Sequence, residues 1–462
     1  MLFELTIASV LSTLLLFFHC FLVFNGDHQK QWITHTHTHT HTTTITTFRD
    51  KNAPSKVYTV LQFMEDAFTK GLTELRPDEQ CYRDALVTMS KRINVPEVGE
   101  LVDKTLSSMK DRAIVPDNTC YSAAIQAWKN VTTNIECDDR DEAARRTLQL
   151  LREMTLAYHR TTKFTIRPTV DNYNHVLEAL AMSSRVTRAV TDAEMLLQAM
   201  EEASSQEETN NVFEEEQDHE ALLSSSAASN DSSPVLQPSI DSYRLVLDVW
   251  YRSKAVDKVS RASIVLKRML DRYEKHSSMQ MIENQSAVVN VFNSFIRVCS
   301  RPATSDEAEM MNILKLALQS TEELQKIGLK PNSATYAALI KACNKLVSEG
   351  GDRQRMLENI FRMCCEGGLV DQLVLLEFQS AASTYLHAKL VVAQSTEVDG
   401  IKVVPESWTR NNTEFLVRTQ KGRKVLPLSI DGKFTETIAS KEHKMRKLRQ
   451  RRNQKFLRGG RM

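Results

Sequence analysis

Five prolines of this chain are each followed, five residues later, by a tyrosine, and this spacing constrains the fold more than any other feature. A further copy has Ala287 in the proline place and Phe292 in the aromatic place. Internal repetition over tens of residues is typical of solenoids, in which each repeat packs mainly against its neighbours. The copies with both residues are Pro77/Tyr82, Pro116/Tyr121, Pro168/Tyr173, Pro238/Tyr243 and Pro331/Tyr336.

Apolar residues recur at fixed distances after each aromatic residue. The positions three, four and seven residues further on are apolar in every copy. These offsets place side chains in one stripe along an α-helix, so the pattern predicts an amphipathic helix with the aromatic ring in the core. The stripe residues are Ala85, Leu86, Met89, Ala124, Ile125, Trp128, Val176, Leu177, Leu180, Val246, Leu247, Trp250, Phe295, Ile296, Cys299, Leu339, Ile340 and Cys343.

Each predicted helix has a physical start, because proline lacks a backbone N–H and stands at or before helix starts. Asp, Asn, Thr or Ser follows and can cap the exposed N–H groups, as in Asn332-Ser333. A second amphipathic pattern then ends before the next proline, and Thr304 with Glu307 is a candidate capping box for one of these second helices. The chain is therefore predicted to be an all-α solenoid of about six two-helix repeats.

Composition agrees with helices. With 13 Gly and 11 Pro in 462 residues, collagen-like and Pro-rich folds are excluded and an all-β fold rich in tight turns is disfavoured. The net charge of +1 conceals two biased segments. Residues 201–237 contain ten Asp or Glu and no Lys or Arg, and residues 441–461 contain ten Lys or Arg and one Glu. We expect a disordered acidic linker and a basic tail, respectively.

The recurrent Pro-x4-Tyr, the aliphatic pair after the tyrosine and the Met109 that stands seven residues before Pro116 resemble the pentatricopeptide repeat family, of the organellar type seen in plants and algae. Residues 329–343 (LKPNSATYAALIKAC) are the closest copy, and the resemblance covers about residues 56–365, with a degenerate leading hairpin at 56–76. Tetratricopeptide repeats rank second, because their Trp-x2-Leu-Gly-x2-Tyr signature is missing. The resemblance implies a right-handed superhelical solenoid that binds single-stranded RNA along its first helices, about one base per repeat.

A second, looser resemblance concerns the end of the repeats. Residues 363–378 (MCCEGGLVDQLVLLEF), followed by residues 405–411 (PESWTRN), resemble the C-terminal end of a subgroup of these proteins in algae with complex plastids.

The resemblance also implies where base specificity lies. In the family, one such side chain directly follows the tyrosine and the other directly follows the next repeat's proline. Of the pairs in this chain, Asn174/Ser239 and Asn293/Asn332 come near the family's typical combinations, and Arg83/Asp117 is able to pair internally. The remaining positions depart from those combinations, which argues against base-by-base reading but does not exclude RNA binding through backbone charge and shape. The first position is Arg83, Ser122, Asn174, Arg244, Asn293 and Ala337, and the second is Asp117, Thr169, Ser239, Val288 and Asn332.

Function follows as an expectation. The sequence favours a non-catalytic RNA-binding protein that supports processing, stability or translation of organellar transcripts. The alternative is a helical-repeat scaffold that binds proteins without RNA contact, and a basic stripe along the first helices would favour RNA. The protein is expected to be a monomer. The tail would hold phosphates without sequence preference, or is an ordinary charged terminus; its residues are Arg446, Lys447, Arg449, Arg451, Arg452, Lys455 and Arg458.

The N-terminus carries a candidate address. Residues 5–24 are mostly apolar and about as long as a bilayer requires. Residues 29–49 are rich in Thr and contain no acidic residue. Such a two-step address is expected for a plastid enclosed by extra membranes, so a plastid is favoured over a mitochondrion. A membrane anchor at residues 5–24 and an over-extended gene model are the alternatives.

Catalysis is not expected, because no nucleotide-binding loop, zinc-protease motif or metal-ligand spacing occurs. The segment after residue 365 is too short for the metal-dependent nuclease fused to some relatives. We expect no cofactor, and the eight cysteines, without a CxxC motif, read as small core residues in a reducing compartment. Nothing fixes a metal geometry in the Thr-His repeat, which comprises His35, His37, His39 and His41.

These observations divide the chain into six segments. They are the targeting or anchor segment with its Thr/His stretch (1–50), a leading half-repeat with the first three repeats (51–200), the acidic linker (201–237), the remaining repeats with a closing helix (238–390), an irregular extension (391–440) and the basic tail (441–462).

Overall fold

The computed structural model describes residues 53–92, 95, 97–133, 140–183, 186–217, 236–275, 285–398, 401–411, 416–419, 422–425 and 428–430. They form two compact units: an N-terminal unit that ends at Pro168 and a C-terminal unit that begins at Thr169. The division falls between the second and third repeats, inside the segment 51–200 that the sequence analysis treats as one.

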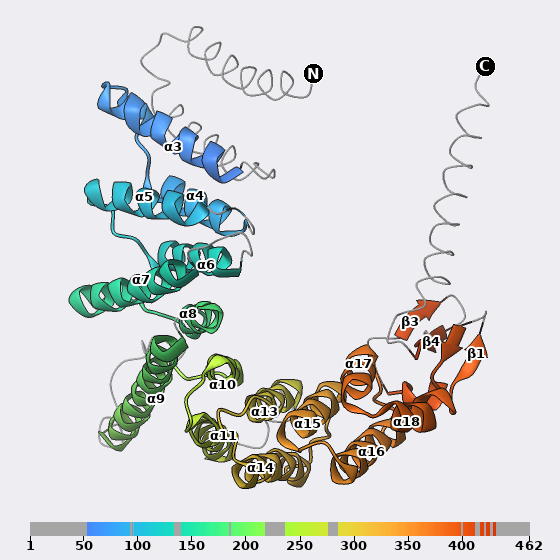
Figure 1. Ribbon diagram of the computed structural model, residues 1–462. Coiled ribbons are helices and arrows are strands. Elements are labelled where there is room, and N and C mark those ends of the chain that lie inside the picture. Colours follow the sequence, from blue (N-terminus) through green and yellow to red (C-terminus); the bar gives the residue numbers. More distant parts are fainter. Residues whose placement is uncertain are drawn as a thin grey trace, which may run out of the picture. The chain divides into compact units, whose positions relative to one another are not determined.

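Six helical hairpins succeed one another along the described part of the chain, which confirms the predicted two-helix repeat (Figure 1). Within each unit, a first helix packs against its own second helix and against the first helix of the preceding repeat. The first helices are α4 (Glu79–Ser90), α6 (Asn118–Thr133), α8 (Val170–Met182), α10 (Ile240–Arg252), α13 (Gln285–Cys299) and α15 (Ser333–Leu346). The second helices are α5 (Val98–Asp111), α7 (Arg140–Thr161), α9 (Val186–Gln217), α11 (Lys258–Lys275), α14 (Glu307–Lys326) and α16 (Gly351–Glu366).

The proline boundaries work as the sequence predicts. In the repeats that have a proline, it is buried, and the next residue stands directly before or at the start of the first helix. Asp117, Ser239 and Asn332 each accept a backbone N–H from three residues ahead, at 2.9, 3.2 and 3.0 Å. Such contacts satisfy N–H groups that have no partner within the helix. The second helix α14 differs from prediction, because its cap is Asp306 and not Thr304.

The predicted apolar stripe forms the core of the repeats. Every stripe residue is buried except Trp128, which is half-buried. The aromatic residue of each repeat is also buried, as predicted. Trp128 lies against α5 at Gly99, where a Cβ atom would stand 2.7 Å from the indole ring. Glycine is therefore required at this close approach.

Two predicted boundaries need correction. The expected leading hairpin at residues 56–76 is one helix, α3 (Ala53–Thr69), followed by a 3₁₀ turn, η1 (Thr73–Leu75). The expected acidic linker does not begin at residue 201, because α9 continues to Gln217. Glutamate is a good helix former, and Glu201 and Ser204 are anchored by side chains of the next repeat, so charge did not end the helix. Residues 218–235 of the linker lie outside the described residues.

The repeats end in a seventh first helix. The helix α17 (Gln372–Ala381) is capped by Asp371, whose carboxylate accepts the Val374 N–H at 2.7 Å, and it packs against α15 as the first helices before it do. A short helix α18 (Thr384–His387) and a π-helical turn η4 (Ala388–Val392) follow. The helical part of the chain therefore runs to Val392, slightly past the boundary at residue 390 that was expected for the closing helix.

Part of the segment expected to be irregular is β-structure. Strands β1 (Thr396–Val398) and β2 (Ile401–Val403) pair antiparallel, as do β3 (Leu416–Thr419) and β4 (Gly422–Val425). The chain returns beside β2, where the Val404 N–H donates to the Leu428 carbonyl at 2.9 Å. Asp-Gly is a common sequence signal for a hairpin, and Asp399-Gly400 stands in the sequence between β1 and β2, so this pairing was open to prediction.

The two C-terminal stretches singled out in the sequence contact each other. Residues 405–411, which include the 3₁₀ turn η5 (Glu406–Trp408), lie along the turn that joins α16 to α17. The Val370 N–H donates to the Trp408 carbonyl at 2.8 Å, and the Asn411 N–H donates to the Gly368 carbonyl at 2.9 Å. Gly368 has a φ of +66°, and a Cβ atom there would stand 2.6 Å from Arg410. This segment therefore closes the last hairpin.

In the described part of the chain, no helix has both the length and the apolar character that crossing a membrane requires. Residues 5–24, the Thr/His stretch and the basic tail lie outside the described residues.

Candidate nucleic-acid interface

The two side chains of a family pair meet where consecutive first helices stack. One follows the buried aromatic residue, in the first turns of its helix, and the other stands at the start of the next first helix. Of the family pairs identified in the sequence, three are in direct contact: Arg83 with Asp117, Asn174 with Ser239 and Asn293 with Asn332. We call each such meeting point a junction.

The α8/α10 junction is a neutral cluster in the C-terminal unit. The Asn174 side-chain amide donates to the Ser239 hydroxyl at 3.2 Å, and its carbonyl accepts from the Ser242 hydroxyl at 2.7 Å. Ser239 and Ser242 also form a capping box at the start of α10. The cap that starts the helix thus also places the second side chain of the pair.

The α13/α15 junction repeats this arrangement. The Asn293 amide donates to Asn332 Oδ1 at 3.1 Å, and its carbonyl accepts from the Thr335 hydroxyl at 2.6 Å. Asn332 and Thr335 form the capping box of α15. Asn293 is 6% exposed, whereas Asn332 beside it is half-buried.

The α4/α6 junction, in the N-terminal unit, is an ion pair. Arg83 Nε and Nη2 lie 3.0 and 2.9 Å from Asp117 Oδ2, and the same guanidinium contacts Glu79 and Gln80. The internal pairing expected from the sequence is confirmed. Several N–H donors of the Arg83 guanidinium already have partners, so this junction differs chemically from the two amide junctions.

Three other predicted positions are placed differently. Arg244 is held by Asp241 and Asp248, each at 2.9 Å. Val288 is not at a helix start, because α13 begins at Gln285, and its side chain is fully buried. Ala337 is also buried.

The remaining pair stands on the two sides of the division between the units. Ser122 donates to Asn118 Oδ1 at 2.8 Å. Thr169 lies at the start of α8, and its hydroxyl donates to Asn172 Oδ1 at 2.8 Å.

Cations on the first helices are mostly matched by carboxylates. Arg297 lies 3.2 Å from Asp248, and Lys341 lies 3.1 Å from Glu377. Arg297 and Arg301 both lie near the Tyr251 ring, at 4.7 and 4.8 Å from its centroid. The described first helices therefore carry mixed charge rather than a continuous basic stripe.

The tyrosines of the repeat are structural. The Tyr82 hydroxyl donates to Glu65 on α3 at 2.7 Å, and the Tyr243 hydroxyl donates to Glu201 on α9 at 2.9 Å. Burial and these carboxylates raise the pKa of both phenols. In the repeat that has Phe292, which lacks a hydroxyl, the residue corresponding to Glu201 is Leu270.

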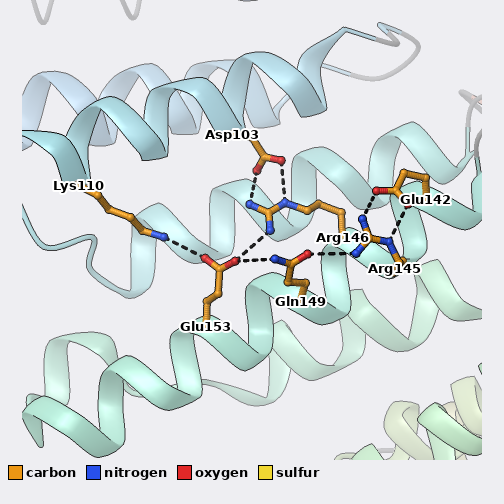
Figure 2. Close-up of polar contacts among 7 residues, drawn as sticks. All are labelled: Asp103, Lys110, Glu142, Arg145, Arg146, Gln149 and Glu153. Atoms are coloured by element: carbon orange, nitrogen blue, oxygen red, sulfur yellow. Dashed lines mark hydrogen bonds and ion pairs between the residues drawn. The ribbon is translucent and has the colours of Figure 1, made fainter.

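Charged side chains also join second helices, as Figure 2 shows. Arg146 on α7 binds Asp103 on α5 through Nε and Nη2, at 2.7 and 3.0 Å, and reaches Glu153 at 3.0 Å. Lys110 on α5 lies 2.9 Å from the same Glu153. Partial burial alone would raise the pKa of Glu153, but Lys110 and Arg146 lower it overall. This network links the two repeats of the N-terminal unit.

The C-terminal unit has a comparable link between α9 and α11. Arg261 lies 3.1 Å from Glu194, and seven residues further along both helices Arg268 contacts Glu201. The network between α5 and α7 has the same seven-residue spacing, from Asp103 to Lys110 and from Arg146 to Glu153. Neither link was predicted from the sequence, although opposite charges at matching seven-residue spacing were a visible signal.

The thiols of the described residues are poorly suited to nucleophilic or redox chemistry. Burial is the main cause that raises the pKa of Cys81, Cys120, Cys299 and Cys365 to about 12 and that of Cys343 to about 11, so the reactive thiolate is scarce near neutral pH. No group of three or more potential metal ligands occurs in the described ranges.

No model of a known protein family matches the chain, and no curated protein matches it. Among solved structures, it is similar to crystal structures of the pentatricopeptide repeat protein PPR10, one of the maize protein and two in complex with an 18-nt psaJ RNA element. Sequence identity is 15%, and the TM-score is 0.31 for the first structure and 0.30 for the complexes. The alignments cover 75% of this chain and 45–46% of those chains, so this chain spans less than half their length. The helical-repeat fold itself rests on the hairpins described above.

Proposed function

We propose that this protein binds single-stranded RNA along its first helices without catalysing a reaction on it. The observation that carries the proposal is the pair of neutral amide clusters at the α8/α10 and α13/α15 junctions. An Asn side chain has two N–H donors and a carbonyl with two acceptor sites. The contacts within the described residues use one donor and one acceptor of Asn174 and of Asn293. What is left matches the donor–acceptor edge of a base.

The spacing of the two clusters gives the proposal a specific form. Between them lies the α10/α13 junction, where Arg244 is held in ion pairs and Val288 is buried. Helical repeats of this kind read about one base each. The protein should therefore prefer particular bases at two nucleotides separated by one nucleotide at which any base is accepted.

Phosphate binding is assigned mainly to the basic tail in this proposal. Carboxylates already balance Arg297 and Lys341 on the first helices, so these side chains add little net positive charge. The residues after 440 contain a dense run of Lys and Arg that would release counterions from RNA.

We also propose that the protein works in an organelle, with a plastid favoured. This proposal is based on the sequence of residues 1–50 alone.

The second candidate function is a protein-binding scaffold. The mixed charge of the first helices is compatible with it, because a solvated surface of paired ions suits a protein partner as well as it suits a nucleic acid. Unlike an RNA-binding groove, such a scaffold would show no base preference.

The test is a fluorescence-anisotropy titration of the full chain with a random single-stranded RNA pool at two salt concentrations. A chain that ends at Ser440 serves as the comparison. We expect the truncated chain to retain binding with a weaker dependence on salt. If binding vanished with the tail, RNA would be bound nonspecifically by the tail and not by the repeats. If neither chain bound RNA, the proposal would be contradicted.

A further inference from the structure

A third side chain takes part in each amide junction, and neither the sequence pattern nor the family pair includes it. It is the residue directly before the tyrosine of the second repeat, namely Ser242 at the α8/α10 junction and Thr335 at the α13/α15 junction. Both side chains are fully buried. Their hydroxyls donate to the carbonyl of the junction asparagine at 2.7 and 2.6 Å.

The hydrogen bonds fix the direction of this hydroxyl proton. The Thr335 oxygen accepts the Asn332 backbone N–H at 3.1 Å, so its single proton remains to be donated. It lies 2.6 Å from Asn293 Oδ1 and 3.1 Å from Asn332 Oδ1, and the shorter contact identifies the acceptor. Asn293 Oδ1 therefore faces the hydroxyl, and its NH₂ group faces Asn332. At the other junction, the Ser242 oxygen accepts the Ser239 N–H at 3.1 Å and orients Asn174 in the same way.

The orientation matters because the two ends of an amide are nearly the same in shape and opposite in hydrogen bonding. An asparagine that turns by 180° about its last bond presents a donor where it had presented an acceptor. A base edge that fits one orientation is mismatched with the other. The α10/α13 junction is consistent with this role of the hydroxyl. It lacks an amide pair, and the residue directly before its aromatic residue is the buried Val291, which has no hydroxyl.

We infer that Ser242 and Thr335 are positioning residues that set which base each amide junction prefers, by holding Asn174 and Asn293 in one orientation. The base-preference part of this inference rests on the proposed RNA-binding function, whereas the orientation itself does not depend on RNA.

The experiment compares Thr335→Val, which removes the hydroxyl at nearly constant shape, with Thr335→Ser, which keeps it. Thr147→Val is the matched control, because Thr147 is equally buried and its hydroxyl bonds only to the Ala144 carbonyl of its own helix, at 2.7 Å, among the described contacts. Each full chain, labelled with ¹⁵N-asparagine, is measured for hydrogen exchange of the Asn293 side-chain amide. Each is also selected against a random single-stranded RNA library to obtain the base preference at each nucleotide.

Loss of one hydrogen bond corresponds to about a fivefold effect. We expect Thr335→Val to speed Asn293 side-chain exchange about fivefold and to lower the preference at one nucleotide by a similar factor. Thr335→Ser and Thr147→Val should stay within about twofold of wild type in both readouts. Unchanged exchange and preference in Thr335→Val would overturn the inference. If the wild-type chain selected no RNA, the proposed function would fail, and the exchange result alone would decide the orientation.

Discussion

The N-terminal and C-terminal units build the same junction with different chemistry. In the N-terminal unit, Arg83 and Asp117 form an ion pair at the α4/α6 junction. In the C-terminal unit, Asn174 and Asn293 are held by neutral partners at equivalent places. The backbone geometry is shared, since the second side chain of each pair also caps the next first helix.

The same helix-capping geometry thus occurs in two chemical settings. Capping favours Asp, Asn, Ser or Thr after the proline for reasons of helix stability alone. Whether that residue is also available to a ligand depends on the side chain stacked against it. An arginine neutralises an Asp cap and engages it, whereas an asparagine leaves a neutral donor and acceptor beside it. We therefore expect recognition to be concentrated in the C-terminal unit.

The largest expected effect comes from removing both amides. Asn174→Ala with Asn293→Ala should raise the dissociation constant for the preferred RNA about 25-fold, because each lost contact corresponds to about fivefold and distant sites add. A fluorescence-anisotropy titration measures this. The matched variant is Arg83→Ala, which should stay within about twofold because its junction is not assigned to RNA. If Arg83→Ala lost as much RNA affinity as the double asparagine variant, the two units would not differ in recognition.

The second prediction concerns stability in the N-terminal unit. Asp117→Ala removes both a helix cap and the ion pair with Arg83, so it should lower the free energy of unfolding by about 1–2 kcal/mol. Asp78→Ala is the control, because Asp78 caps α4 through the Cys81 N–H at 2.8 Å and should cost about 1 kcal/mol. Urea denaturation measures both. The RNA base preference of Asp117→Ala should equal that of wild type, and a changed preference would assign this junction to recognition after all.

The third prediction converts one kind of junction into the other. Arg83→Asn, Asp117→Asn and Cys120→Thr together reproduce the side chains of the α13/α15 junction at the α4/α6 junction. This chain should acquire a preference of about fivefold at one further nucleotide, because it gains an oriented amide. RNA selection and sequencing measure it. The double variant that keeps Cys120 should gain less, and no gain in a folded triple variant would show that the amide cluster is insufficient.

The smallest expected effect is a dependence of stability on pH in the N-terminal unit. Lys110 and Arg146 hold the pKa of Glu153 below its ordinary value of 4.5. A carboxylate whose folded-state pKa is depressed stabilises the protein above its unfolded pKa, and this contribution is lost as pH falls through the folded value. The contribution is intact near pH 6, so as pH falls from there to well below 4.5, wild type should lose up to about 1 kcal/mol relative to Glu153→Gln. Denaturation curves at several pH values measure this, and parallel curves for the two chains would contradict it.

The sequence predicted the repeated hairpin well because two independent physical signals coincide in it. The period of about 3.6 residues after each aromatic placed the core stripe, and the proline marked each helix start. Boundaries failed where only one signal was present. Charge at Glu201 suggested solvation, but the helix continued, and Val288 lies inside α13 because no proline stops that helix from starting at Gln285.

The candidate site was predicted only in part. The two residues of each pair follow from a fixed spacing between repeats, whereas the third residue of each junction has no such signal in the sequence. Ser242 and Thr335 look in the sequence like ordinary residues of the first helical turn. Their contact with the preceding repeat depends on how the first helices stack, which spacing alone does not give. The partners of Arg244 were also overlooked, although this contact is local: Asp241 and Asp248 stand three and four residues away on the same helix, a spacing that favours ion pairs.

The most direct test of the central claim is a selection of random single-stranded RNA by the full chain, followed by sequencing of the bound molecules. We expect two preferred nucleotides separated by one without preference, and we expect Asn174→Ala and Asn293→Ala each to abolish one of the two preferences. Bound RNA without any base preference, or a preference that survives both substitutions, would contradict it.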